Sequence, residues 1–162
     1  MAAVDYFLKI DTIDGESQDS KHKGEIELDS FSFGVNQTGS VSFGGGGGAG
    51  KAQFQDFHFT SSTGKSSPKL MQSCATGVHF KKAVLTMRKA GETPKEFIKI
   101  TLEDLLVSSY QNGGSRGSET LPADQFSLNY AKITFVFTPE DDKGASLPPI
   151  TGGFDVKLNR AV

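Results

Sequence analysis

Long apolar–polar alternations that change phase part-way through constrain the fold of this chain most strongly. In residues 125–139 the apolar positions are even-numbered up to Tyr130 and odd-numbered from Ile133 onward. The same change of phase occurs between Leu102 and Leu105. A straight strand keeps its parity because successive side chains point to opposite faces of the sheet. These runs therefore predict long strands that bend sharply.

A third run, residues 24–34, changes phase as well. Its apolar positions are even up to Leu28 and odd from Phe31, which predicts a β-bulge or a switch between sheets near residues 29–30. Bent strands close barrels or feed two packed sheets. The sequence therefore predicts a mainly β fold, a bent-strand β-barrel of two packed sheets. Shorter alternations add a strand at residues 4–11, from which Phe7 departs, a long strand at 78–91 and a closing strand at 154–158.

One short helix is expected among the strands, over residues 66–77. Ser66 or Ser67 is the N-cap, Pro68 takes the first helical position, and Gly77 ends the helix. The helix should flank the barrel and lie on its wall through one apolar stripe. This stripe consists of Leu70, Met71 and Cys74.

Composition excludes several classes of function. The 162 residues fit one domain, 1–162, with a net charge of −2 and no basic stripe, so no nucleic-acid partner is expected. No apolar run approaches the roughly 20 residues of a membrane span, and the N-terminus lacks the pattern of a secretory signal. The single cysteine, Cys74, fits synthesis in a reducing cytoplasm and is interpreted as a small buried residue.

The stretch SFGGGGGAGK at residues 42–51 imitates a phosphate-binding loop. Such a loop needs Ser or Thr after its lysine and a helix immediately beyond. Here Ala52 follows Lys51, and residues 53–60 alternate as a strand. We therefore interpret residues 34–52 as a long glycine-rich extended loop rather than a nucleotide site, and we expect no cofactor.

The other candidate sites also fail for want of partners. Residues 113–117 fit G-x-S-x-G around Ser115, but they lie in a polar connection, 110–124, expected to be a long mobile loop without a following helix. Neither a metal nor a catalytic site is expected. The histidines have no metal-ligand spacing: His22 is expected to be solvated, and His58 and His79 to lie on strand surfaces. The acidic set Glu25, Glu27 and Asp29 indicates a solvated strand face.

Ordered motifs make the chain resemble the haemolysin-coregulated proteins, Hcp, of type VI secretion. The segment TGKSSPKLMQSCATGVHFKKAVLTMRKAG (63–91) is similar to the signature stretch of that family. Residues 4–28 resemble its N-terminus, residues 31–60 its aromatic strand and glycine-rich loop, and residues 100–114 its long strand. The resemblance extends over residues up to about 137, and residues 139–153 do not align with the family. Phe31 and Phe33 stand where tryptophan is common.

This resemblance implies a β-barrel with one flanking helix that forms hexameric rings stacked into the inner tube of a contractile injection machine. It implies no enzymatic activity, and export without a signal peptide from the cytoplasm to the outside or a target cell. The implied partners are other copies of the chain, the sheath, spike and baseplate proteins, and small effector proteins held in the lumen. Candidates for the lumen side are Ser30 and Ser32, which are small and polar and alternate with Phe31 and Phe33.

The glycine-rich loop is the candidate contact with a neighbouring subunit or ring. Its residues are Gly44, Gly45, Gly46, Gly47, Gly48, Ala49, Gly50 and Lys51. Two other functions are open at this point. The chain could be a soluble adaptor or chaperone that forms rings but no tube, or an enzyme that uses the glycine loop or Ser115.

Overall fold

The structure of the chain is a computed structural model that describes residues 3–37, 50–117 and 119–162. This part is built mainly of β-strands, with one α-helix, α1 (Ser67–Thr76). The expected mainly β fold with one short helix is confirmed, although the sheet does not close into the expected barrel. In chain order the strands are β1 Val4–Ile10, β2 Ile26–Glu27, β3 Ser30–Ser32, β4 Val35–Asn36, β5 Gln53–Phe54, β6 Phe57–Ser62, β7 His79–Lys89, β8 Lys95–Gly113, β9 Ala123–Phe137, β10 Ile150–Asp155 and β11 Arg160–Ala161.

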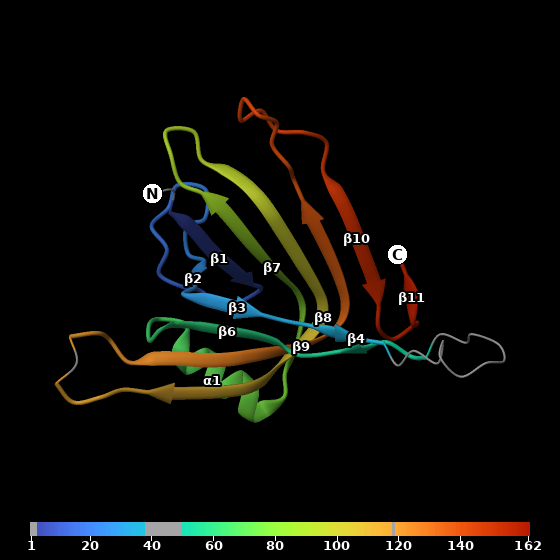
Figure 1. Ribbon diagram of the computed structural model, residues 1–162. Coiled ribbons are helices and arrows are strands. Elements are labelled where there is room, and N and C mark those ends of the chain that lie inside the picture. Colours follow the sequence, from blue (N-terminus) through green and yellow to red (C-terminus); the bar gives the residue numbers. More distant parts are fainter. Residues whose placement is uncertain (1–2, 38–49, 118) are drawn as a thin grey trace.

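All the pairings in the main sheet are antiparallel, in the order β11-β10-β9-β8-β7-β1-β2. Strand β6 also pairs with β9, and β3 pairs with β6. Strand β9 is shared: its first half pairs with β6 and its second half pairs with β10, while β8 accompanies both halves. Figure 1 shows the result, an upright part and a lower part that meet where β8 and β9 bend.

The predicted changes of phase coincide with these bends. In β8, Ile100 and Leu102 are buried before the change, and Leu105 and Val107 are buried after it. Asp104 lies between the two pairs with a φ of 51°, in the left-handed region that non-glycine residues rarely occupy. The strand thus turns its other set of side chains toward the core without leaving the sheet.

The phase change near residues 29–30 is a switch of partner within the sheet. Strand β2 pairs with β1, whereas β3 pairs with β6. Between them Leu28 donates its backbone N–H to Tyr6 at 3.0 Å, and Asp29 donates to Thr60 at 2.8 Å. Strands β2 and β3 are separate and short, so the sheet wraps around its core without closing into a barrel.

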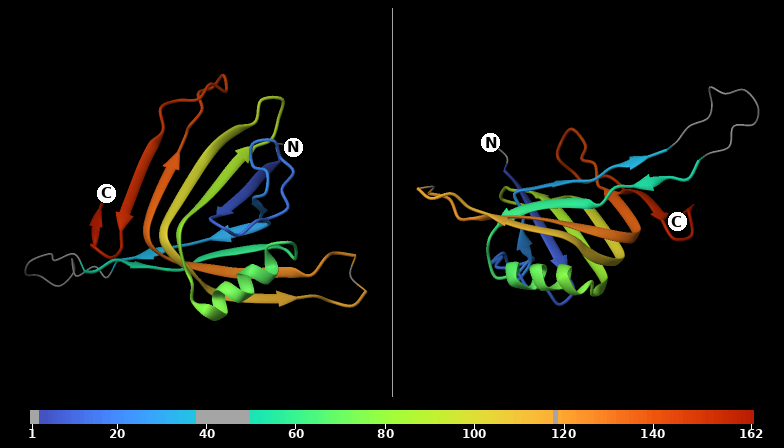
Figure 2. Two further views of the ribbon diagram at one scale, coloured as in Figure 1. Left: turned by 180° about the vertical axis from the view of Figure 1, so that it is seen from behind. Right: turned by 90° about the horizontal axis from the view of Figure 1, so that it is seen from below.

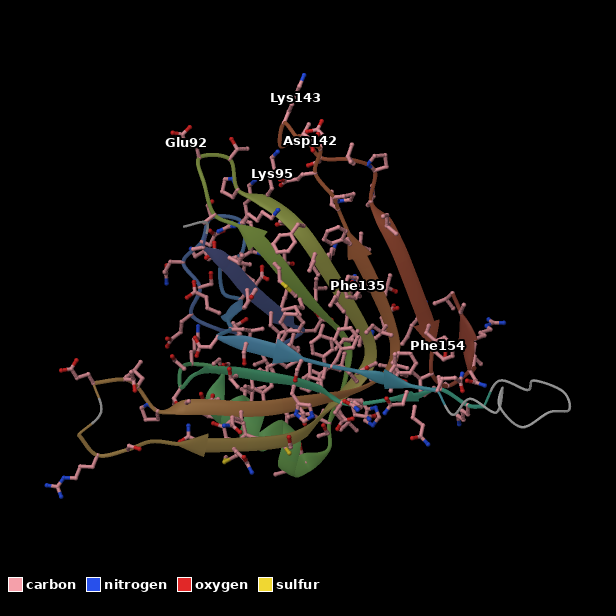
Figure 3. All side chains as sticks on the ribbon, viewed as in Figure 1. Glu92, Lys95, Phe135, Asp142, Lys143 and Phe154 are labelled. Atoms are coloured by element: carbon pink, nitrogen blue, oxygen red, sulfur yellow. The ribbon has the colours of Figure 1, made fainter. Side chains whose placement is uncertain are left out.

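One hydrophobic core fills the bend between the two parts of the sheet. It draws on β1, β6, β7, β8, β9 and α1, and its most deeply buried side chains are Leu8, Ile10, Phe57, Phe59, Leu70, Leu85, Ile100, Leu105, Val107, Phe126 and Leu128. Figure 3 shows Phe135 and Phe154, which pack against this core from β9 and β10, and the side chains of Glu92, Asp142 and Lys143 at the loop tips.

Helix α1 has the predicted ends. Pro68 lies in its first turn, and Gly77 ends it with a φ of 68°. The expected apolar stripe is only partly correct, because Leu70 is fully buried whereas Met71 is 55 % exposed. Adjacent helical residues point about 100° apart, so only one of the two can face the sheet. Cys74 is half-buried, as a small residue at the edge of this contact. Figure 2 shows α1 beside the lower part of the sheet.

Several segment boundaries differ from the expected ones. The predicted closing strand at 154–158 is wrong: β10 ends at Asp155, and residues 156–159 form a turn in which Asp155 accepts a hydrogen bond from the Leu158 N–H. The expected loop 110–124 is shorter, because β8 extends to Gly113 and β9 begins at Ala123. This long hairpin and the β4–β5 hairpin project from the body in opposite directions (Figures 1 and 2).

The glycine-rich connection links the two strands of one hairpin, β4 and β5. Val35 pairs with Phe54 and Asn36 pairs with Gln53, so the expected loop 34–52 contains a strand at its start and is bounded by another. Residues 38–49, which include Gly44 to Ala49, lie outside the described residues. Beyond Lys51 the chain enters β5 and β6 rather than a helix, which removes the context that a phosphate-binding loop requires.

Candidate functional site

Strands β3, β6, β9 and β8 lie side by side and turn one polar side outward. We call this side the polar face. The cross-strand register places its side chains in two rows, because residues directly opposite each other point the same way. The first row is Ser32, His58, Ser127 and Ser109, and the second is Ser30, Thr60, Gln125 and Gln111. All except Ser127 are exposed or half-buried.

The reverse side of the same strands is aromatic. Phe31, Phe59 and Phe126 lie opposite one another in register, and Phe59 stacks on Phe126 with centroids 5.2 Å apart. Phe59 and Phe126 are almost completely buried, whereas Phe31 is half-buried. Strict alternation in β3, β6 and β9 therefore fixes which side chains face the core and which form the polar face.

Hydroxyl groups satisfy one another across the polar face. Ser30 and Thr60 are joined by a hydrogen bond of 2.6 Å between their hydroxyl oxygens, and Ser109 and Ser127 by one of 2.5 Å. Neither row contains a Lys, Arg, Asp or Glu. One carboxylate, that of Asp56, is half-buried beside the first row and accepts hydrogen bonds from neutral groups, Ser108 at 2.7 Å and Asn129 at 2.8 Å.

The sheet that carries the polar face has two free edges. Strand β3 pairs with β6 on one side, and no other strand of the described residues pairs with it. At the opposite side, the β7 pairing of β8 ends at Leu106, so the stretch from Val107 to Gly113 pairs only with β9 within the described part of the chain. Free edges of this kind can accept a strand from another chain.

The predicted lumen candidates both lie on the polar face. Ser30 and Ser32 are exposed, and the intervening Phe31 packs against Tyr6 and Phe57 on the reverse side. Their expected parity is therefore correct, and their role in a lumen stays a prediction. Of the candidate loop contact, Gly50 and Lys51 are described: Gly50 is half-buried and Lys51 is exposed.

The rejected sites for chemistry gain no support from the geometry. Ser115 lies in the loop between β8 and β9, with a strand rather than a helix beyond it. Among the residues that the structure describes, no group of His, Cys, Asp and Glu is arranged to hold a metal ion. His58 and His79 are exposed on strands as predicted. The pKa of Asp104 is lowered, first by a hydrogen bond from Lys157 and then by one from His79, in an ordinary surface cluster.

The expectation of a solvated His22 is wrong. Its side chain is buried, stacks on Phe7 and lies within 2.8 Å of two carboxylates, those of Glu25 and Glu96. The His22 imidazole thereby covers Phe7, which breaks the alternation of β1 and lies on the outer side of the sheet. The expected solvated face is correct for Glu27 and Asp29, which are exposed.

Sequence reasoning missed the buried carboxylate of Asp124. It is fully buried at the start of β9 and accepts hydrogen bonds from Ser67, Tyr110 and Asn112, all of them uncharged groups. A signal was present, because Asp124 shares the even parity of Phe126 and Leu128 and must point to the same side.

One family model and one curated relative match most of this chain. A family model described as "Type VI secretion system effector, Hcp" matches residues 7–137. The curated relative "Protein hcp1" of Pseudomonas aeruginosa is 43% identical over 159 residues, which cover 97% of this chain and 98% of the relative.

Solved structures are similar over the whole length. Hcp1 from Salmonella typhimurium has a TM-score of 0.81 at 34% identity and covers 100% of both chains. A structure described as a type six secretion system protein has a TM-score of 0.93 at 28% identity, covering 99% of this chain and 100% of the other. None of the described helices is long and apolar enough to cross a membrane.

Proposed function

Because the chain belongs to the Hcp family of type VI secretion proteins, we propose that it is the structural subunit of the inner tube of such a system. Copies of the chain form a hexameric ring, and the rings stack into a tube that is exported from the cytoplasm without a signal peptide. The protein has no enzymatic activity in this proposal. It acts by assembling and by carrying small effector proteins in its lumen.

The observation that carries the proposal is the four-stranded sheet with a free edge on each side. Its strands alternate in direction, so β3 and β8, the first and the fourth, run antiparallel. A second copy placed beside the first would bring its β3 against the free part of β8 in antiparallel orientation. This contact is heterologous, and such contacts generate closed rings when the rotation closes. The repeated sheet would then surround a lumen.

The polar face suits the inside of such a ring. Apart from the His58 imidazole, its groups are hydroxyls and amides, which carry no net charge and neither attract nor repel the charged surfaces of different cargo proteins strongly. We therefore assign Ser30 and Ser32, together with the two rows to which they belong, to the lumen. The reverse side, with Phe59 and Phe126, already forms the core of the subunit.

The remaining partners follow from the tube. The outer side of the ring would meet the contractile sheath, and the tube ends would meet the spike and baseplate proteins. We assign residues 44–51 to a contact with a neighbouring subunit or ring, because in the sequence they lie between β4 and β5, the two strands of the hairpin that projects from the body.

A disulfide ladder tests the ring contact directly. Within one chain Ser32 and Ser109 lie at opposite ends of a four-strand row, so their Cα atoms are roughly 14 Å apart, which is too far for a disulfide. In the proposed ring, Ser32 of one copy approaches Ser109 of the next. In a Cys74→Ala background, Ser32→Cys with Ser109→Cys should oxidise to a covalent ladder that ends at a closed hexamer.

Each single cysteine variant is the matched control and should give no ladder beyond a dimer. The pair Ser30→Cys with Gln111→Cys, at the two ends of the second row, tests the same contact at a second position along the edge. Native mass measurement and electron microscopy complete the test. A monomer at high concentration, with no ladder from either pair, would contradict the ring, and rings that never stack would favour the adaptor.

A further inference from the structure

Residues 14–25, which connect β1 to β2, form a strap with its own backbone hydrogen bonds. Gly15 donates to Gly24 at 2.8 Å, Gly24 donates to Ser17 at 2.9 Å, and Ser17 donates to Glu25 at 3.1 Å. These bonds fold the strap back on itself. What attaches it to the rest of the molecule is a small set of side chains.

His22 makes the central attachment. Its imidazole is 7% exposed and stacks on Phe7 of β1, with ring centroids 4.4 Å apart and an angle of 9° between the planes. Nδ1 lies 2.8 Å from Oε2 of Glu25, which belongs to the strap, and Nε2 lies 2.8 Å from Oε1 of Glu96, which belongs to β8. The second contact ties the strap to a strand more than seventy positions away.

Two carboxylate partners define the proton content of this imidazole. A neutral imidazole has one N–H donor and one bare nitrogen, which can only accept a hydrogen bond. With carboxylates at both nitrogens, a neutral ring would place one bare nitrogen against an anionic oxygen. Only the imidazolium ion donates at both positions, so the observed geometry belongs to protonated His22.

The charges around the imidazole reinforce this assignment. The strap contributes Asp19 and Glu25, β1 contributes Asp5, β7 contributes Arg88, and β8 contributes Glu96. Lys21 and Lys23 of the strap are exposed. Arg88 is committed to Asp19 and to Asp5, so Glu25 and Glu96 have His22 as their cationic partner among these groups.

We propose that residues 14–25 form a proton-controlled strap, fastened to β8 by the Glu25–His22–Glu96 bridge when His22 is protonated and released at that point when it is neutral. Loss of the proton removes one of the two donors. Glu96 is the partner that then separates, because its side chain is 45% exposed whereas that of Glu25 is 13% exposed.

Release would affect the segment that follows the strap. The chain continues from Glu25 directly into β2 and then into β3, the edge strand assigned above to the contact between copies. This consequence depends on the proposed function. The strap mechanism itself is a property of the single chain and is tested without assembly.

Hydrogen–deuterium exchange of the strap amides tests the proposal on the full chain. Protection factors of Gly15, Ser17 and Gly24 are measured between about pH 5 and pH 8.5, a range that includes the usual titration of imidazole groups. We expect these protection factors to fall roughly tenfold or more as the pH rises, since charge-assisted hydrogen bonds contribute at that level. Amides in the centre of β7 and β8 should keep their protection.

Two variants separate the strap from general pH effects. Glu96→Gln supplies an amide that can donate to a neutral imidazole or accept from a protonated one, so the protection factors should become nearly independent of pH. Glu92→Gln, at the exposed turn of the same hairpin, should keep the wild-type dependence. Equal wild-type protection across the range, or an unchanged dependence in Glu96→Gln, would overturn the proposal whether or not the chain forms rings.

Discussion

The phenol of Tyr110 donates a hydrogen bond of 2.8 Å to Oδ1 of Asp124, a carboxylate with no exposure to solvent. Asn112 donates to the same oxygen at 2.8 Å, and Ser67, the first residue of α1, donates to the other oxygen. A buried charge is costly unless it is hydrogen-bonded, and the start of a helix favours an anion. Asp124 therefore joins the β8–β9 hairpin to the helix.

Removing this carboxylate should destabilise the fold markedly. Asp124→Ala leaves the hydroxyl groups of Tyr110 and Ser67 without their acceptor in a buried site, so we expect the free energy of unfolding to fall by roughly 2–4 kcal/mol. Urea denaturation measures the loss. Asp142→Ala, at an exposed loop position, is the control and should change stability by no more than about 0.5 kcal/mol. Equal stability of both variants would contradict the anchoring role.

A glycine pair provides a second test of close packing. A Cβ at Gly15 would lie 2.4 Å from the carbonyl oxygen of Glu25, a backbone atom that cannot move aside, whereas a Cβ at Gly91 would meet nothing within 4 Å. We expect Gly15→Ala to lower the free energy of unfolding by roughly 1–3 kcal/mol, and the melting temperature should fall with it. Gly91→Ala should be neutral or slightly stabilising. If Gly15→Ala is as stable as wild type, the strap is not held against residue 25 as described.

The bends of this fold were predictable because parity is a local property of a strand. The change of phase between Leu102 and Leu105 indicated a bend in β8, and the change between Leu28 and Phe31 indicated the passage from β2 to β3. What the pattern could not show is whether the wrapped sheet closes. Closure depends on pairing between segments distant in sequence, here β2 with β1 and β3 with β6.

The errors arose where a side chain is satisfied by a distant segment. Polar neighbours suggested a solvated His22, but Phe7, an apolar residue on the wrong side of β1, needed a cover that the strap supplies. At the C-terminus, the alternation of Val156 and Leu158 suggested a strand, whereas the Asp155 side chain captures the Leu158 N–H and produces a turn. Neither the stacking of His22 on Phe7 nor the hydrogen bond between Asp155 and Leu158 can be predicted from the polarity and periodicity of neighbouring residues.

Alkaline pH should weaken the fold through Tyr130. Burial, followed by the negative charge of Asp56, raises the pKa of this phenol from 10.0 to about 12. Between these values the folded chain keeps a proton that the unfolded chain releases, so the free energy of unfolding falls as the pH rises through this window. The contribution is fully present below pH 10, and its loss, at about 1.4 kcal/mol per pKa unit, amounts to about 3 kcal/mol.

Comparison with Tyr130→Phe isolates this effect. The variant loses the hydrogen bond that the Tyr130 hydroxyl donates to the Gln55 carbonyl at 3.0 Å, which lowers its stability at neutral pH by about 1 kcal/mol. Its stability should then vary less between pH 10 and pH 12 than that of the wild type. Urea denaturation at a series of pH values measures both curves, and parallel curves would contradict the assignment.

Reagents of different size should distinguish thiols on the polar face from thiols on the outside of an assembled tube. In a Cys74→Ala background, Ser32→Cys places a thiol on the polar face, and Lys82→Cys places one on the upright part of the sheet, beyond the bend. Its thiol points away from the core, since the neighbouring Ala83 and Leu85 face the core. If the polar face lines a closed lumen, a thiol at residue 32 should react with a small maleimide but not with one that carries a large polymer. A thiol at residue 82 should react with both reagents.

Disassembled protein provides the reference, because both thiols are then exposed and should react with both maleimides. If residue 32 is protected from the large reagent only after assembly, the polar face has become enclosed. The fold of a single subunit cannot cause such protection. Reaction of residue 32 with the polymer reagent in intact tubes, at the rate found for residue 82, would place Ser30 and Ser32 on an accessible surface and remove the lumen assignment. The ring contact would survive that result, because the disulfide ladder tests the edges of the sheet independently of its faces.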